Sequence, residues 1–467
     1  MRTNLPDLAG PFSLVTRGAG VALTCCMKAK LKPIAGSVVA PRGFKAAGVF
    51  CDIKRLGTGK GSDKGRKRDL ALIVSEAPAS VAGMFTTCQA CAAPVKVCIE
   101  RVKGGRACAV VVNSGNANAC TGKQGLADAR EMARFTERAL ALPEGSALVG
   151  STGRIGVTLP MDNVRAGIIE AAAGLGATVR HAAQAEEAIM TSDTRPKQVA
   201  LELRLGGKAV RIGGMCKGAG MIQPGMSATG NRAAATPLHA TMLCFITTDA
   251  AVEPRVLQAA LREAVAHSFN RITVDGDMST NDTVLVLANG LAGNRRLGLR
   301  TRDFAMFQAA LNQVCLELAK MIVRDGEGVS RFVTLRVNGA RSFAEADAAA
   351  RAVANSALVK TSWHGGDPNW GRIIAALGYS PATVVEDRVD IGYSAPGSRK
   401  VLWSLKRGQP TAATFKALCA AVAPREFDLH INLNLGSGAA LMYAADLTED
   451  YVAFNKGDVN DPSSLGG

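Results

Sequence analysis

The sequence predicts a mixed α/β fold of the α+β kind, and three observations support this prediction. Hydrophobic residues make up 48% of the 467 residues, which is enough to bury a large core. Strand-like and helix-like patterns occur in mixed order in both halves of the chain. No GxGxxG motif follows a strand and no GKS or GKT loop is present, so the pattern argues against a nucleotide-binding architecture.

The individual elements follow from local patterns. A high density of β-branched residues predicts strands at GVFCDI, LALIVSE and ACAVVVNSG, and further strands are predicted at RFVTLRV, VDIGYS and DLHINLNL. Apolar residues at helical spacing predict helices at GLADAREMARFTERALAL, MDNVRAGIIEAAAGL, EPRVLQAALREAVAHSF and FAMFQAALNQVCLELAKMIV. The apolar runs are far shorter than the roughly 20 residues that cross a bilayer, so no membrane partner is expected.

The charge and the cysteines restrict the partners. The net charge of +16 suits an anionic partner, but only 4% of the residues are aromatic and the basic residues are scattered, so no nucleic-acid partner is expected. The run KGSDKGRKR at 60–68 is typical of a solvated loop rather than a phosphate-binding patch. Cys88 and Cys91 form a CxxC motif without a second such pair, which favours buried or unreactive thiols over a zinc site, and no metal is expected.

Residues 1–33 differ from the rest as a basic N-terminal extension. The alternatives are an organelle transit peptide, a disordered tail, or a start codon upstream of Met27. The extension does not resemble a secretory signal peptide, so a cytoplasmic location is expected and organelle targeting stays open. Its basic residues, set against the single acid Asp7, are Arg2, Arg17, Lys28, Lys30 and Lys32.

Thr241 stands between a long loop rich in Gly, Ala and Pro and the apolar run MLCFI. It is either the first residue of a strand or the first residue of a new chain. A threonine at a chain N-terminus carries its own base, because the free α-amine has a pKa of about 7.7–8.0 and lies close to the hydroxyl. For this chemistry the bond between Ala240 and Thr241 must break first, by a shift of the acyl group from nitrogen to oxygen and hydrolysis of the ester.

Three further stretches carry candidate residues. In LVGSTGRIG, the Thr152 hydroxyl and the Gly153 N–H are suited to hold an oxyanion, although STG is also a common turn. NSGNANACTG is either a hydrogen-bonded structural turn or part of a site. Glu327 in IVRDGEGVS is placed to accept a cationic amine or lies in a solvated turn.

Taken together, these motifs resemble the ornithine acetyltransferase family, the glutamate N-acetyltransferases of arginine biosynthesis. The resemblance covers roughly residues 34–455 and rests on APRGFKAAGV, VVNSGNANACTG, STGRIGVTLPMD, MTSDTRPK, KGAGMI, ATMLCFITTDA, FNRITVDGDMSTNDT, IVRDGEGVSRFVT and GGDPNWGRI. It implies a layered sandwich of sheets between helices, similar to the DmpA-type aminopeptidases. It also implies a precursor that cuts itself into an α chain, residues 34–240, and a β chain, residues 241–467, which assemble as an α2β2 heterotetramer.

The resemblance also implies a mechanism. Thr241 takes the acetyl group from N2-acetyl-L-ornithine, Thr152 and Gly153 stabilise the oxyanion, and L-glutamate then removes the acetyl group in a ping-pong reaction. No cofactor is implied, and whether acetyl-CoA serves as a second donor is left open. The substrate contacts implied by the family motifs are Thr191, Lys217, Thr241, Glu327, Asn455 and, at the position of a family hydroxyl residue, Asn460.

Two alternatives accompany this reading. An insertion within GMSATGNRAAATPLH separates Lys217 from Thr241, and SATG creates a rival nucleophile, Thr229. The sequence favours Thr241, because the apolar run that follows it can anchor a new N-terminus in a sheet.

The competing functions are a DmpA-type aminopeptidase, with water as acceptor, and a binding or structural relative that stays uncut.

Overall fold

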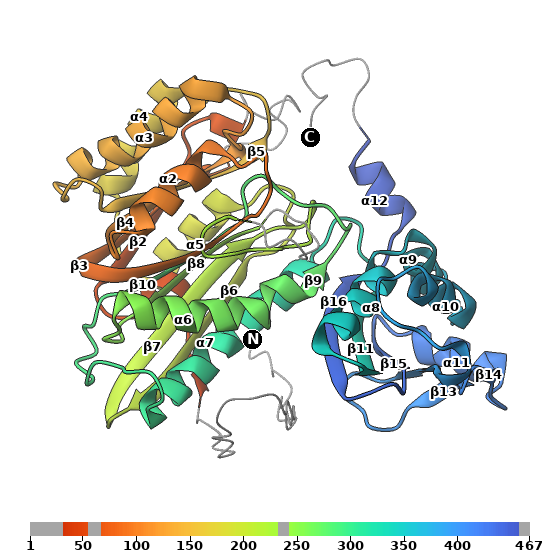
Figure 1. The fold of residues 1–467 in the computed structure, drawn as a ribbon. Coiled ribbons are helices and arrows are strands. Elements are labelled where there is room, and N and C mark those ends of the chain that lie inside the picture. Colours follow the sequence, from red (N-terminus) through yellow and green to blue (C-terminus); the bar gives the residue numbers. More distant parts are fainter. Residues whose placement is uncertain (1–30, 55–66, 232–241, 457–467) are drawn as a thin grey trace.

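The computed structural model describes residues 31–54, 67–231 and 242–456, which form two lobes, each built around a β-sheet (Figure 1). Two clusters of buried apolar side chains fill the larger lobe and a third fills the smaller, C-terminal lobe. Among the helices in these ranges, none combines the length and the hydropathy that a bilayer span requires.

The first sheet contains nine strands of the described residues. Their order is β1-β6-β7-β8-β10-β3-β4-β5, and β2 pairs with β3 beside this path. The strands are β1 (Lys32–Pro33), β2 (Phe44–Val49), β3 (Leu70–Phe85), β4 (Arg106–Asn116), β5 (Ala147–Arg154), β6 (Lys197–Leu205), β7 (Lys208–Lys217), β8 (Leu243–Thr248) and β10 (Thr283–Ala288).

The long strand β3 divides this sheet into two layers because its halves have different partners. Its first half pairs with β2 and β4, whereas residues 80–85 pair with β10, and the register with β4 shifts between Val74 and Ala79. The layers pack face to face: a Cβ atom placed on Gly150 in β5 would lie 3.2 Å from the ring of Phe245 in β8. The larger lobe is therefore a sandwich of two sheet layers.

Helices cover both outer faces of this sandwich (Figure 1). The layer of β2, β4 and β5 is covered by α2 to α4, and the layer of β6 to β8 and β10 by α6 and α7. The helix α5 packs on β2 and also contacts β7 of the other layer. Each helix presents an apolar stripe to its neighbours, and Thr301 caps the start of α7, because its hydroxyl accepts the Phe304 N–H. The helices are α2 (Ala93–Val102), α3 (Gly122–Ala139), α4 (Met161–Ala173), α5 (Val179–Ile189), α6 (Pro254–Ala266) and α7 (Arg302–Arg324), with the 3-10 turns η1 (Ser37–Val39) and η3 (Phe269–Arg271).

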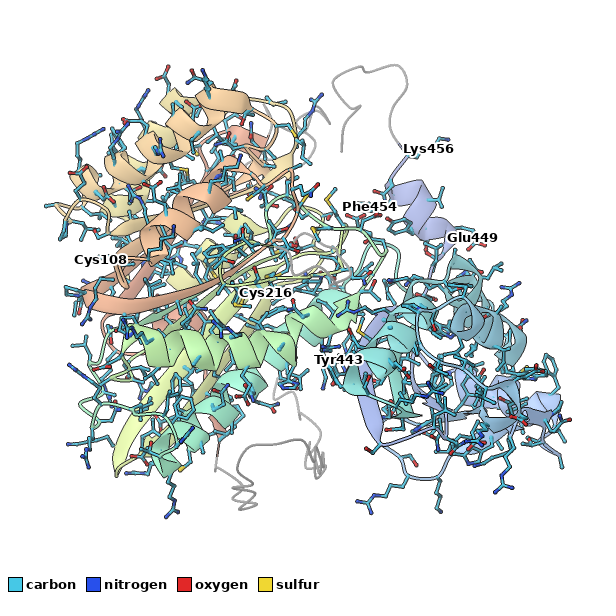
Figure 2. The ribbon with its side chains drawn as sticks, in the orientation of Figure 1. Cys108, Cys216, Tyr443, Glu449, Phe454 and Lys456 are labelled. Carbon is cyan, nitrogen blue, oxygen red and sulfur yellow. The ribbon has the colours of Figure 1, made fainter. Side chains whose placement is uncertain are left out.

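The second sheet has the strand order β14-β13-β12-β15-β11-β16-β9, and α8 to α11 pack on one of its faces. Tyr443 on the other face lies between the lobes (Figure 2), where the Lys320 ammonium of α7 is 5.2 Å from its ring. The elements are β9 (Ile272–Thr273), β11 (Phe332–Ala340), α8 (Phe343–Asn355), α9 (Ala357–His364), α10 (Trp370–Gly378), η4 (Glu386–Arg388), β12 (Asp390–Ser394), β13 (Leu402–Lys406), β14 (Gln409–Pro410), α11 (Phe415–Val422), β15 (Glu426–Asn432), β16 (Gly438–Ala445) and α12 (Glu449–Phe454).

The predicted mixed α/β sandwich is confirmed, as are the predicted helices and most of the predicted strands. The strand expected at GVFCDI is misplaced, because β2 already begins at Phe44 and ends at Val49. The chain leaves the sheet there because the Asp69 carboxylate accepts the N–H groups of Cys51 and Ile53, both at 2.7 Å. The predicted cleavage point before Thr241 falls between β7 and β8, two neighbouring strands of the first sheet.

Candidate active site

The candidate oxyanion residues lie at the end of β5. Thr152 is buried, and Gly153 has a φ of 128°, a backbone conformation that favours glycine. A Cβ atom on Gly153 would lie 2.3 Å from the carbonyl carbon of Gly115 in the adjacent strand β4. Only glycine fits this position without a shift of the neighbouring backbone of β4.

The NSGNANACTG loop supports this strand from the side. The Ser151 hydroxyl donates to the Asn113 side chain at 2.6 Å, and Asn116 Nδ2 donates to the Thr158 carbonyl at 3.0 Å. Just before β10, Asn281 Nδ2 donates to the Ser151 carbonyl at 2.8 Å. These contacts give the loop a structural role: they fix the strand on which Thr152 lies.

Lys217, the last residue of β7, brings a cation to the same place. Its side chain is buried, and Nζ donates to Thr152 Oγ1 at 3.2 Å. Burial lowers the pKa of Lys217, and the negative charges of Asp193, Glu327 and Asp282 oppose this effect. Two residues predicted from separate motifs are therefore in direct contact.

The proposed nucleophile Thr241 and its neighbour Ala240 lie outside the described residues, and the next residue, Met242, is described. The Met242 N–H donates to the Asp282 carboxylate, and its carbonyl accepts the Thr283 N–H at 3.0 Å. Burial raises the pKa of Asp282 well above its ordinary value. The backbone directly after Thr241 is thus fixed beside β10, and Leu243 pairs with Lys217 in the ladder of β7 and β8.

The rival Thr229 is in a different environment. It is exposed in a turn, where its hydroxyl accepts the Asn231 N–H at 3.3 Å. The two described residues that follow it, Gly230 and Asn231, do not belong to a strand, whereas β8 begins two residues after Thr241.

The other predicted substrate residues lie on loops near Lys217. Glu327 N–H donates to the Ala219 carbonyl at 2.9 Å, and Asn455 Nδ2, just after α12, donates to Glu327 Oε2 at 3.0 Å. The Thr191 N–H donates to Asp193 Oδ2 at 3.0 Å. Asn460 lies outside the described residues.

The last helix of the described residues, α12, lies in this region, with Glu449 and Phe454 along it and Lys456 beyond its end (Figure 2). The helix approaches the DGEG turn closely: a Cβ atom on Gly328 would lie 2.3 Å from the Tyr451 nitrogen. At the other end of α12, His364 Nε2 lies 2.8 Å from Glu449 Oε2. These contacts hold Asn455 next to Glu327.

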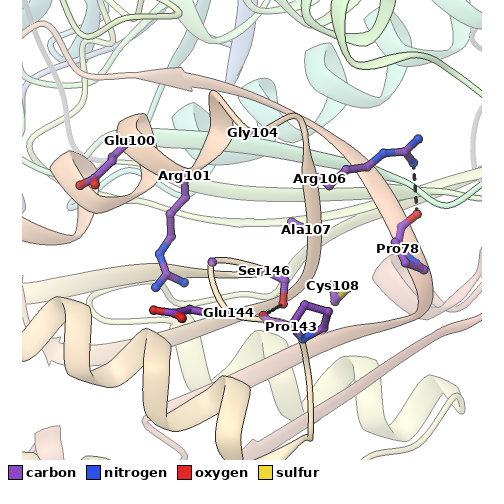
Figure 3. Close-up of a pocket in the computed structure, with 11 residues that line it drawn as sticks. Pro78, Glu100, Arg101, Gly104, Arg106, Ala107, Cys108, Pro143, Glu144 and Ser146 are labelled. Carbon is purple, nitrogen blue, oxygen red and sulfur yellow. Dashed lines mark hydrogen bonds between the residues drawn. The ribbon is translucent and has the colours of Figure 1, made fainter.

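A surface hollow of about 470 Å³ lies elsewhere, between the end of α2 and the start of β4 and β5 (Figure 3). It is lined by Arg101 and Arg106, but Arg101 pairs with Glu137 and Arg106 donates to the Pro78 carbonyl at 3.4 Å. None of the residues predicted for acetyl transfer lines it. Within the described ranges, no three His, Cys, Asp or Glu side chains are grouped as metal ligands.

Sequence reasoning missed the charged residues that surround Lys217. Asp193, Lys197 and Asp325 form a buried cluster, and Asp282 holds the start of β8. All four lie within or next to the motifs quoted above, but the motifs alone do not reveal which charged side chains are buried.

Comparisons with known proteins show which family the chain resembles. The ArgJ family matches residues 45–457. The arginine biosynthesis bifunctional protein ArgJ of Symbiobacterium thermophilum is 48% identical over 422 residues, which cover 90% of this chain and 98% of the relative. The protein of the same name from Geobacter sulfurreducens is 46% identical over 414 residues, covering 89% of this chain and 98% of the relative.

Among solved structures, the ornithine acetyltransferase of Mycobacterium tuberculosis, crystallised with ornithine, is 38% identical. The match covers 42% of this chain and 100% of that chain, with a TM-score of 0.38. The match to the family extends over both lobes described above and includes every motif that contributes to the site. The chain therefore belongs to the ArgJ family.

Proposed function

We propose that this acetyltransferase of arginine biosynthesis moves the acetyl group of N2-acetyl-L-ornithine to L-glutamate through an acetyl-Thr241 intermediate. One observation carries the proposal: Lys217 Nζ lies 3.2 Å from Thr152 Oγ1, at the end of the sheet where β8 begins just after Thr241. The Thr152 hydroxyl, the Lys217 ammonium and the first residue of β8 therefore lie at the same end of the sheet.

The first step is self-cleavage. The Thr241 hydroxyl attacks the Ala240 carbonyl, the peptide C–N bond breaks and an ester forms. Water hydrolyses this ester, which leaves a carboxylate on Ala240 and a free α-amine on Thr241. That amine is then the base for the acetyl-transfer reaction.

Acetyl transfer follows in two half-reactions. The amine of Thr241 takes the hydroxyl proton while the oxygen attacks the acetyl carbonyl, and L-ornithine leaves with this proton on its own amine. L-glutamate's amine then attacks the acetyl ester and restores the Thr241 hydroxyl. In both half-reactions, the Thr152 hydroxyl and the Gly153 N–H hold the oxyanion, each typically contributing about 2.7–4 kcal/mol.

The residues around this centre suit zwitterionic amino-acid substrates. The Lys217 ammonium is placed to pair with a substrate carboxylate, and Glu327 with an ammonium group. We propose that Thr191, Asn455 and Asn460 complete the substrate contacts, that no cofactor is required, that acetyl-CoA serves as a second acetyl donor, and that the cut chains assemble as α2β2.

The proposal is tested with Thr241→Val and the matched control Thr229→Val. Thr241→Val should remain one chain of 48.4 kDa and lose acetyl exchange between acetylornithine and glutamate, whereas Thr229→Val should be cut and active. Intact mass and N-terminal sequencing of the smaller fragment give the cleavage site. An active uncut chain, or a fragment that begins at a residue other than Thr241, contradicts the mechanism. Release of acetate without N-acetylglutamate would instead indicate a hydrolase.

A further inference from the structure

The Asp193 carboxylate links two loops that carry predicted substrate residues. Its side chain is fully buried. Oδ1 accepts the Gly218 N–H at 2.7 Å, directly after Lys217, and Oδ2 accepts the Thr191 N–H at 3.0 Å. One carboxylate therefore fixes the backbone next to both residues.

Lys197 extends this link to a third loop. Its ammonium is buried between Asp193 Oδ1, at 2.6 Å, and the Asp325 carboxylate. Asp325 opens the DGEG turn and also accepts the Thr194 N–H at 3.0 Å. The loops that carry Thr191, Lys217 and Glu327 are thus joined through one buried cluster of charges.

The cluster also sets the electrostatic environment of Lys217. Asp193 faces the two ammonium groups of Lys197 and Lys217, and Asp325 pairs with Lys197 and, at 3.6 Å, with Arg195. Burial acts to raise the pKa of Asp193, but Lys217, Lys197 and the Gly218 N–H outweigh it and lower this pKa to about 2. Asp193 therefore stays ionised and favours the charged form of Lys217.

Other charged groups also face Lys217. Burial lowers its pKa and Asp193 is the strongest opposing influence; Lys197 lowers this pKa further, while Glu327 and Asp282 raise it. Asp193 differs from these other groups in that it also holds the backbone of the adjacent residue, Gly218.

We propose that Asp193 is a positioning residue for acetyl transfer: it fixes the position of Lys217 and keeps its ammonium charged, so that Lys217 can bind the substrate carboxylate. This inference rests on the acetyltransferase function proposed above. Asp193 acts through Lys217 and the Thr191 loop and does not touch the reacting atoms.

The test is Asp193→Asn, with Asp249→Asn as the matched control. Asp249 is likewise buried and accepts a backbone N–H, that of Arg211 at 2.7 Å, but it lies just past the other end of β8. We expect Asp193→Asn to raise the KM for N2-acetyl-L-ornithine about 10-fold with a smaller change in kcat, since a displaced binding group costs up to about 100-fold. The control should keep the wild-type KM.

A second readout separates this role from a merely structural one. Removal of the Asp193 charge lowers the pKa of Lys217 further, so the alkaline limb of the kcat/KM profile should move to lower pH by about one unit. Asp193→Glu, which restores a carboxylate, should return this limb toward the wild-type position.

Asp193→Asn removes one of the two carboxylates that pair with the buried Lys197 ammonium, and a buried charge without its partner is strongly destabilising. If this variant does not fold, Asp193→Asn/Lys197→Gln carries the same test, because it removes one charge of each sign. A wild-type KM together with an unmoved alkaline limb in the folded variant overturns the inference and leaves the proposed function intact. Absence of acetyl exchange in the wild-type protein instead refutes the proposed function.

Discussion

Lys217 and Thr152 are joined by a 3.2 Å hydrogen bond from Nζ to Oγ1, although β8, β10, β3 and β4 lie between their strands in the sheet order. The contact forms because β3 pairs with β10 along one half and with β2 and β4 along the other. The change of partners folds the sheet into two layers, which places the ends of β5 and β7 side by side.

Thr152→Val should slow acetyl transfer without unfolding the protein. The change removes a hydroxyl that we place at the oxyanion, so kcat should fall about 100- to 1000-fold. Thr136→Val is the matched control, because the Thr136 hydroxyl is equally buried but donates to the Met132 carbonyl within α3, at 2.8 Å. Steady-state kinetics check the prediction, and equal rates for both variants would remove Thr152 from the mechanism.

Gly328→Ala should disturb substrate binding through α12. Gly328 has a φ of 65°, and a Cβ atom there would lie 2.3 Å from the Tyr451 nitrogen, so the helix that positions Asn455 must shift. Gly397→Ala carries a similar backbone strain at a φ of 70° but meets nothing within 4 Å. Both variants should lose about 1 kcal/mol of stability from strain, while only Gly328→Ala should raise KM, by about 10-fold. A KM that is equal in the two variants would show that α12 does not shape the site.

Glu186→Gln should stabilise the protein in a pH-dependent way. Glu186 is buried in α5, and burial raises its pKa from 4.5 to about 8, with Lys197 opposing only in part. Between these two values the unfolded chain has released a proton that the folded chain retains, so the contribution of Glu186 to stability falls as pH rises through this window.

The Gln variant does not titrate. Its free energy of unfolding should therefore differ little from that of the wild type at pH 5 and exceed it by roughly 2 kcal/mol or more at pH 8. Thermal unfolding midpoints at the two pH values check this. Glu144→Gln, at an exposed position, should show the same offset at both values. A Glu186→Gln offset that is also independent of pH would contradict the raised pKa.

Local patterns predicted the elements well where the local sequence decides the structure. The helical spacing of apolar residues in α7 and the β-branched run in β4 each predict the element from its own residues, and both elements agree with the prediction within a few residues. The strand predicted at GVFCDI was misplaced because the strand's end is set by Asp69, which lies outside this stretch and whose carboxylate accepts two backbone N–H groups there.

The sequence motifs name candidate site residues but do not reveal how these residues are arranged. Family motifs name Thr152 and Lys217, but their contact depends on the change of partners along β3, which has no local signature. Lys197 follows an arginine and a proline and resembles a solvated lysine, yet its side chain is only 1% exposed. Burial of a charge depends on elements that are distant in the sequence, so the cluster around Asp193 emerges only from the fold.

The strand order has a consequence for a chain that is cut before Thr241. Across the sheet, β7 and β3 come from the first fragment, and β8 and β10 lie between them and come from the second. The two fragments are interlocked, so neither can separate without breaking ladders on both sides. Refolding of the cut protein from denaturant then requires two chains to meet, so its yield should depend on the protein concentration. An uncleavable variant should refold at a rate that dilution leaves unchanged.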